Sequence, residues 1–272
     1  MSEWQPDTPV SRINQGAGNQ ALEVPEELVQ IIERGIEYGI LSKGAFDITW
    51  RGMGALWSFG EDFSVPDEQE VRDAVKRVGF SRIRIIDNKV LLPDPGMAIG
   101  LGGIAKGYAI DRAGLKLRQA GIQNFMVDGG GDILVAGQIG DRSWRLGIRD
   151  PRGGPADLIK KLSVQDGAVV TSGDYERFKL VNGRRYHHII DPRTGWPAEG
   201  CRSVTVYSST AERADVLATA VFVLGPDEGL ELVRNFPETE VLVIDSGGII
   251  WMTKGFESLL DNKSAPGKPG IG

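Results

Sequence analysis

Two oxygen-bearing side chains stand four residues apart in a segment that is otherwise apolar. Asp215 and Thr219 belong to the segment ADVLATAVF, and a helix would present both of them on one face. A carboxylate is costly to bury without a partner, so Asp215 should meet a cation, an arginine or water. A carboxylate beside a hydroxyl suits Mg²⁺, which prefers oxygen ligands. The spacing therefore predicts a magnesium site. The alternative is an aspartate that is bonded to an arginine or to a helix end.

A second candidate is the glycine-dense segment GLGGIAKG at 100–107, which leads into a predicted helix. Free backbone amides and the helix dipole favour an anion such as phosphate at this point, and Lys106 would add a positive charge. A tight turn without a ligand is the alternative. The segment also matches the dinucleotide spacing G-x-G-x-x-A, but residues 119–124 offer no acid for a ribose hydroxyl. A nicotinamide oxidoreductase is therefore the weaker interpretation.

The two histidines of the chain are adjacent, His187 and His188, in the segment HHIIDPRTG. Histidine exchanges a proton near neutral pH, so one of the pair could be a general base. Neighbouring residues of a strand face opposite sides, so at most one points into a given cleft. An ordinary strand histidine is the alternative. Asp47 is interpreted as a helix cap or a ligand contact, and residues 171–174 as a polar turn or part of a site.

Composition excludes several classes of protein. The 272 residues carry 31 Lys plus Arg against 37 Asp plus Glu, a net charge of −6, and this acidic balance argues against nucleic acid as a partner. The single cysteine, Cys201, excludes an intramolecular disulfide and a cysteine-based zinc site. Neither a membrane-spanning helix nor a signal peptide is predicted, which would make the chain cytoplasmic as written.

The candidate residues must be positioned by a mixture of helices and short strands. Apolar periodicity predicts helices that begin near residues 25, 66 and 106, and a further helix at 210–225 that Ser209 and Glu212 open as a capping box. Short alternating segments predict strands and hairpins between them, with Asn182 and Gly183 as one hairpin turn. Residues 1–23 are expected to form a loose terminus or a connecting loop. Strands outnumber crossover helices, so the predicted fold class is α+β.

Taken in order, six segments resemble the ApbE family, the FAD:protein FMN transferases. They are LSKGAFDIT, LGGIAKGYAID, VDGGGDILVAG, VVTSGDYERF, HHIIDPRTGWP and ERADVLATAVFVLG. The similarity covers about Trp4 to Thr253. It implies one ApbE-like α+β domain over residues 1–262, with antiparallel sheets flanked by helices, and a disordered tail at 263–272.

The resemblance implies a Mg²⁺-dependent enzyme that cleaves FAD at its pyrophosphate. The FMN portion is attached through a phosphoester to a threonine of an acceptor flavoprotein, such as a subunit of an ion-pumping NADH:quinone reductase or a related electron-transport complex. Some relatives instead hydrolyse FAD to FMN and AMP, which is the alternative activity. A catalytically impaired flavin-binding protein is the second alternative.

The resemblance also assigns roles to individual residues. His188 corresponds to the proposed general base on the acceptor threonine. The implied Mg²⁺ site consists of Gly103 through its carbonyl, Asp215, Ala218 and Thr219. The positions implied for FAD binding are Trp4, Ala45, Phe46, Asp47, Gly100, Lys106 and Ile189. Phosphoryl transfer needs charge neutralisation and alignment, which a metal, a lysine and the amides of a glycine turn would supply.

Two features depart from the family pattern. The family usually has an acidic residue where this chain has Gly100, giving DLGG in place of GLGG. Family members also carry several dozen residues before the W-x-P-D-[ST] region, often with a signal peptide or a lipid-anchor cysteine, and many are periplasmic or anchored to the membrane. Here that region begins at Trp4, so we expect an N-terminally shortened member of the family.

Overall fold

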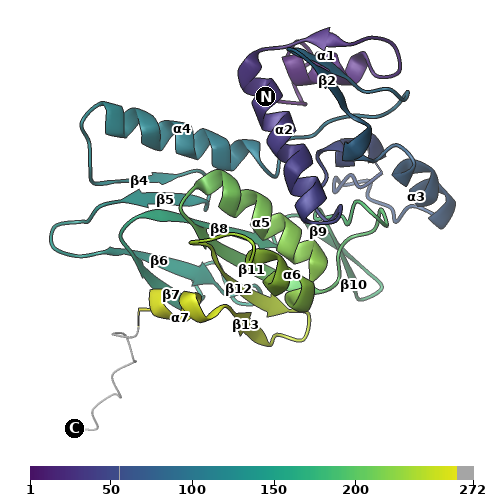
Figure 1. Cartoon of the computed structure of the whole chain (residues 1–272). Helices are drawn as coiled ribbons and strands as arrows, with labels where there is room; N and C mark the ends of the chain where they lie inside the picture. Colours follow the sequence, from purple (N-terminus) through teal and green to yellow (C-terminus); the bar gives the residue numbers. More distant parts are fainter. Residues whose placement is uncertain (55, 262–272) are drawn as a thin grey trace, which may run out of the picture.

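A computed structural model describes residues 1–54 and 56–261, and a six-stranded antiparallel sheet forms its centre (Figure 1). The strand order is β13-β12-β11-β8-β5-β4. Strand β11 lies between β8 and β12 and is rich in β-branched residues, which suits a central position. The strands are β4 (Phe125–Asp128), β5 (Ile133–Ala136), β8 (Gly167–Gly173), β11 (Cys201–Ser208), β12 (Glu240–Asp245) and β13 (Ile250–Met252).

The two faces of this sheet bury different sets of side chains, because successive residues of a strand point to opposite sides. Leu134 and Val243 face one hydrophobic cluster, whereas Val135 and Leu242 face a second one. On the first face lie the helices α4 (Ala105–Gln119) and α5 (Ala211–Leu224), which pack against each other. The second face is covered by β6 (Trp144–Arg149), β7 (Leu158–Val164) and α7 (Lys254–Leu259). The sheet is therefore the middle layer of three.

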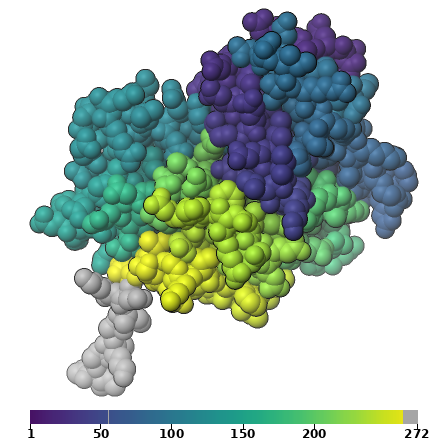
Figure 2. All heavy atoms as spheres, in the orientation of Figure 1, coloured from purple at the N-terminus to yellow at the C-terminus, as the bar shows by residue number. Residues whose placement is uncertain are grey.

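The N-terminal hundred residues gather beside this sandwich, where they form the purple and blue part of Figure 2. A three-stranded sheet of order β1-β3-β2 belongs to this part, and a two-stranded β9–β10 hairpin lies near it in Figure 1. The helices of the N-terminal part are α1 (Pro9–Gln15), α2 (Glu26–Leu41) and α3 (Glu68–Val75), with 3-10 turns η1 (Ile48–Met53) and η2 (Phe80–Arg82). The small strands are β1 (Leu22–Glu23), β2 (Arg84–Ile86), β3 (Lys89–Leu91), β9 (Phe178–Val181) and β10 (Arg184–His187).

The predicted helices near residues 25, 66 and 106 and the hairpin at Asn182 and Gly183 are confirmed by α2, α3, α4 and the β9–β10 turn. Both turn residues have positive φ, as a two-residue hairpin requires. The expectation of a loose terminus at 1–23 is wrong. Thr8 caps α1, Pro9 occupies its first turn, and Val10 and Ile13 are buried.

The predicted capping box of α5 is also wrong. Thr210 is the N-cap, and its hydroxyl accepts a hydrogen bond from the Arg213 amide. Glu212 does not fold back onto the cap, because its carboxylate forms a bidentate ion pair with Arg34 at 2.6 and 2.8 Å. An arginine from a distant helix therefore outcompetes the local capping arrangement.

Helix α5 leads through Gly225 into α6 (Pro226–Val233), which packs against it. Within residues 1–54 and 56–261, no helix combines the length and apolar character needed to cross a membrane. The tail expected to be disordered, 263–272, lies outside the described residues.

Candidate functional site

The first turn of α4 and the middle of α5 are held together at Gly107. The Gly107 amide donates a hydrogen bond of 3.0 Å to Oδ2 of Asp215. A Cβ at Gly107 would overlap the main-chain carbonyl of Ala211, so only glycine allows the helices to approach this closely. Asp111, one turn further along α4, accepts the amides of Ala211 and Glu212 at 2.8 and 2.9 Å. Helix α4 thus fixes both the start of α5 and the orientation of the Asp215 carboxylate.

Asp215 is buried, and burial raises its pKa to about 7, with the nearby negative charge of Asp132 as the next cause. Thr219 follows one turn later on the same face of α5. Its hydroxyl lies 3.5 Å from that of Ser172 in β8 and 3.5 Å from the point where Gly103 would carry a Cβ. The glycine turn, β8 and α5 therefore meet at one place, which brings Gly103 and Thr219 close together.

Lys106 points to the same place from the first turn of α4. Its ammonium lies 2.7 Å from the Asp132 carboxylate, which is only 2% exposed, whereas the lysine side chain is 46% exposed. Burial raises the pKa of Asp132, and the lysine opposes that shift. The lysine is thus anchored on its inner side and open to solvent on its outer side.

The segment Ala45 to Asp47 lies under the glycine turn and is buried. The Phe46 ring comes within 3.0 Å of the Cβ position of Gly103. Asp47 caps η1: one carboxylate oxygen accepts the amide and hydroxyl of Thr49, and the other accepts the Phe80 amide. The cap interpretation of Asp47 is therefore confirmed, and the internal bonds occupy both oxygens of its side chain.

The two histidines have different surroundings. His187 is buried, its Nε2 lies 2.8 Å from the Ala198 carbonyl, and its Nδ1 accepts the Ile189 amide at 3.3 Å. His188 follows β10 with an exposed side chain, although the surrounding protein still desolvates the ring enough to lower its pKa to about 4. The charges of Arg177 and Lys106 act in the same direction, which places His188 within electrostatic reach of the glycine turn. Its ring is neutral at pH 7.

Gly100 has a structural partner that the sequence alone did not reveal. A Cβ at this position would lie 2.8 Å from the indole of Trp50, whose Nε1 donates to the Gly100 carbonyl at 3.1 Å. The Gly100 amide in turn donates to the Ile48 carbonyl at 2.8 Å. The volume that an acidic side chain would need here is therefore filled by tryptophan.

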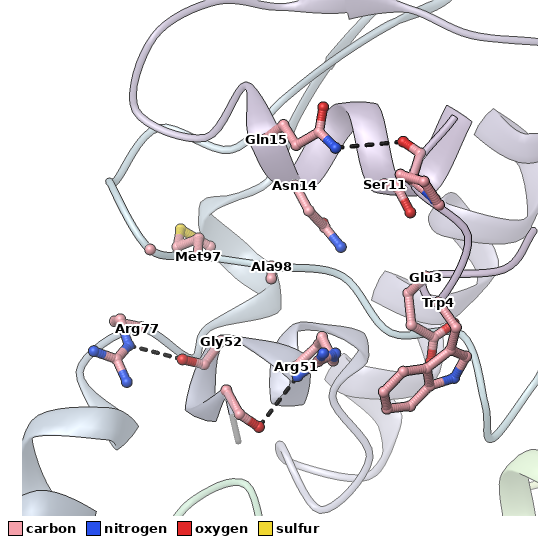
Figure 3. A pocket seen from close by; sticks show the side chains of 13 residues that line it. Glu3, Trp4, Ser11, Asn14, Gln15, Arg51, Gly52, Arg77, Met97 and Ala98 are labelled. Atoms are coloured by element: carbon pink, nitrogen blue, oxygen red, sulfur yellow. Dashed lines mark hydrogen bonds between the residues drawn. The ribbon is translucent and has the colours of Figure 1, made fainter. Parts of the chain in front are cut away.

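Trp4 lines a surface cavity of about 490 Å³ (Figure 3). Its side chain is 69% exposed, and the Arg51 guanidinium lies 4.8 Å from the ring centroid. Asn14, Arg77 and Met97 also line the cavity. Of the residues predicted for the site, Trp4 alone lines this cavity. None of the residues of the α4–α5 junction, which are Gly103, Lys106, Gly107, Asp215 and Thr219, belongs to its lining.

The donor set at the junction suits a hard cation. Among the described residues no cluster of three or more His, Cys, Asp or Glu could hold a metal, so a cation would need mixed oxygen donors. The Asp215 carboxylate, the Thr219 hydroxyl and the Gly103 carbonyl are such donors, and Mg²⁺ keeps several waters in mixed sites of this kind. Ala218 is fully buried and, like Gly103, has only its main-chain carbonyl oxygen to offer. The ligand set itself stays a prediction.

Sequence reasoning missed Asp132, Asp111 and Trp50. Their partners are Lys106, the start of α5 and Gly100, each of them between 26 and 101 positions away along the chain. The segments VDGGGD and AKGYAID each end in an aspartate, and this was the signal that the sequence offered for Asp132 and Asp111. The sequence does not reveal which distant group each carboxylate contacts.

Comparison with solved structures defines the class of protein. The structure superposes on the ApbE protein of Thermotoga maritima with a TM-score of 0.88 at 37% identity, covering 95% of this chain and 85% of that one. It superposes on the flavin transferase ApbE of Vibrio cholerae with a TM-score of 0.84 at 29% identity, covering 96% and 85%. The predicted α+β fold with antiparallel sheets and flanking helices is confirmed.

Sequence comparison gives the family. Residues 1–243 match the model of the ApbE family. The FAD:protein FMN transferase of Treponema pallidum is 36% identical over 262 residues, 90% of this chain and 72% of that protein. A protein of the same name from Klebsiella pneumoniae is 30% identical over 96% of this chain and 77% of its own length. The chain belongs to the ApbE family, which confirms the resemblance found in the sequence.

Proposed function

We propose that this chain is a Mg²⁺-dependent FAD:protein FMN transferase that modifies a threonine of an acceptor flavoprotein. The observation that carries the proposal is the convergence of Lys106, the Gly107 amide and Asp215 at the start of α4. Phosphoryl transfer from a pyrophosphate requires charge neutralisation and alignment, and a lysine cation beside a carboxylate that a main-chain amide holds in place for a metal would supply both. The names of the relatives support the same activity.

Asp215, Thr219 and the Gly103 carbonyl would hold Mg²⁺, which supplies charge neutralisation and polarises phosphate oxygens when it is bound. Lys106 binds the pyrophosphate of FAD through the exposed side of its ammonium. The Gly107 amide keeps the Asp215 carboxylate aimed at the cation site and holds it in one rotamer. The closely packed α4–α5 pair preserves this alignment through the reaction.

His188 takes the proton in the transfer step. The threonine oxygen attacks the phosphorus of the FMN portion, a new phosphorus–oxygen bond forms, and the bond to the bridging oxygen breaks so that AMP departs with that electron pair. The hydroxyl proton moves to the neutral ring of His188, whose lowered pKa keeps it unprotonated at pH 7. His187 fixes the chain around this base, because its ring bonds to the amide of Ile189, the residue after His188, and to the carbonyl of Ala198.

The test is to incubate the chain with FAD, Mg²⁺ and an acceptor domain that bears a threonine flavinylation motif. We expect the intact mass of the acceptor to rise by one FMN, with one AMP released for each FMN attached. AMP release without modification of the acceptor would establish the pyrophosphatase alternative instead. FAD binding with neither product would establish an impaired flavin-binding protein. Replacing the acceptor threonine by alanine is the matched control.

A further inference from the structure

Three consecutive glycines separate β4 from β5, and the turn they form ends on a buried acid. Gly129 leaves no room for a side chain, since a Cβ there would lie 2.6 Å from the Ile110 side chain of α4. Gly130 and Gly131 have φ values of 74° and 95°, which L residues with side chains rarely adopt. The Gly131 amide donates to Asp128 at 2.8 Å and closes the turn.

The turn delivers Asp132 to the inner side of Lys106. Asp132 is 2% exposed, and apart from the ion pair with Lys106 its Oδ2 atom has no hydrogen bond within the described part of the chain. A buried carboxylate that meets a half-exposed ammonium at 2.7 Å fixes the position of that ammonium and leaves its outer face free. A buried acid of this kind is costly unless its partner stays in place, so the pair orders the lysine.

We propose that Asp132 is a positioning residue that acts through Lys106, holding the ammonium where the pyrophosphate of FAD binds. This inference rests on the proposed function for the identity of the ligand. The glycine triplet serves the same end, because its close approach to α4 sets the distance between the carboxylate and the lysine. Asp132 itself touches neither the substrate nor the reacting atoms.

A double-mutant cycle with Asp132→Asn, Lys106→Met and the double variant tests this inference. FAD affinity is measured by quenching of flavin fluorescence, and KM and kcat by release of AMP. We expect Asp132→Asn to weaken FAD binding and raise KM about tenfold, with kcat changing less. In the Lys106→Met background the same substitution should have no further effect on affinity. Additive effects of the two substitutions would overturn the inference.

Asp261→Asn is the matched control. The Asp261 side chain is only 5% exposed and pairs with Arg145 of β6 at 3.0 Å, on the face of the central sheet opposite α4 and α5. We expect this variant to melt at a lower temperature while FAD affinity stays unchanged. An equal loss of FAD affinity in Asp261→Asn would mean that breaking any buried ion pair has this effect, and would overturn the specific role of Asp132.

Asp132→Glu keeps the experiment decisive if the asparagine variant does not fold. It retains the charge at a longer reach, so FAD affinity should fall less than in Lys106→Met, whereas a loss as large would contradict positioning by the ion pair. The binding measurement also separates the two proposals. If the wild-type chain binds FAD without turnover, the proposed function is contradicted, but the double-mutant cycle can still be measured from FAD affinity. If turnover occurs and the cycle is additive, only the role of Asp132 is contradicted.

Discussion

The α4–α5 junction and the cavity beside Trp4 show two ways of presenting residues to a ligand. At the junction Asp215 is buried and bonded to a backbone amide of another element, and the inner side of Lys106 is held by a buried acid. At the cavity Trp4 is largely exposed, with the Arg51 guanidinium stacked against it. The difference indicates that packing holds the groups proposed for the chemistry in place, whereas the tryptophan at the cavity is largely surrounded by solvent. Substitutions in the two regions should therefore differ in size and in kind.

The largest effect is expected at the junction, from Asp215→Ala. Loss of the carboxylate removes the one charged donor of the proposed cation site, so Mg²⁺-dependent turnover should fall by about 10³-fold or more. FAD binding should survive in part, because Lys106 and the start of α4 remain. Turnover is measured by AMP release over a Mg²⁺ titration, and FAD binding by flavin fluorescence. Unchanged turnover in this variant would contradict the metal assignment.

His188→Ala should lower the transfer rate by about 10²-fold, as expected for loss of a general base. In the wild type, the lowered pKa of about 4 keeps the ring neutral well below pH 6.5. At saturating Mg²⁺, the acid limb that His188 contributes to the rate profile should therefore lie near pH 4 to 5 and not near 6.5, and that limb should be absent from the variant.

The same lowered pKa has a consequence for stability, with a definite sign. The folded state favours the neutral ring of His188, so its contribution is present above the unfolded pKa of 6.5 and is lost as the pH falls from there toward 4. Comparing the unfolding of wild type and His188→Ala between pH 8 and pH 5 checks this. A contribution that grows on acidification would contradict the assignment.

Gly100→Asp should lower the free energy of unfolding by about 1 to 3 kcal/mol, because a Cβ there lies 2.8 Å from the Trp50 indole. Adding Trp50→Ala should relieve part of that loss, so the two substitutions should be non-additive in denaturant titrations. Gly102→Asp is the matched control, since nothing lies within 4 Å of a Cβ at Gly102. Equal losses at Gly100 and Gly102 would contradict the packing explanation.

The smallest effect is expected from Trp4→Ala. An exposed side chain contributes little to folding, so the melting temperature should hardly change. If the open cavity takes part in binding FAD, KM should rise a few-fold while kcat stays constant, the pattern of a lost contact that the ground state and transition state share. An unchanged KM would separate the cavity from the FAD site and restrict that site to the region of the junction.

Much of the fold could be predicted from the sequence, because its elements carry local signals. Helix α2 has an amphipathic period, and the Asn182-Gly183 turn requires positive φ at both positions. Helix α1 was missed, although Thr8 and Pro9 formed a start signal, because the polar composition around it resembled a loop. The interpretation of α5 was correct for the helix and wrong for the cap, since the partner of Glu212 is the distant Arg34.

In the candidate site too, local patterns could be predicted from the sequence and long-range contacts could not. The i,i+4 spacing of Asp215 and Thr219 and the glycine turn with Lys106 were visible as local patterns, and the structure brings them together. The role of Asp132 could not be predicted, because the residues next to an aspartate in the sequence do not indicate which distant lysine it will pair with. This chain has Gly100 where the family usually has an acid, and only the contact with Trp50, fifty positions earlier in the chain, explains the glycine.

One turn and a half of α4 satisfies three separate requirements at once. Lys106 faces outward, the Gly107 amide orients Asp215, and Asp111 bonds the first two amides of α5. A substitution at any one of these positions alters the frame on which the other two depend, so their effects cannot be independent. We therefore expect these three positions to change among relatives only together, whereas Ala109, the exposed residue between Gly107 and Asp111, can change freely.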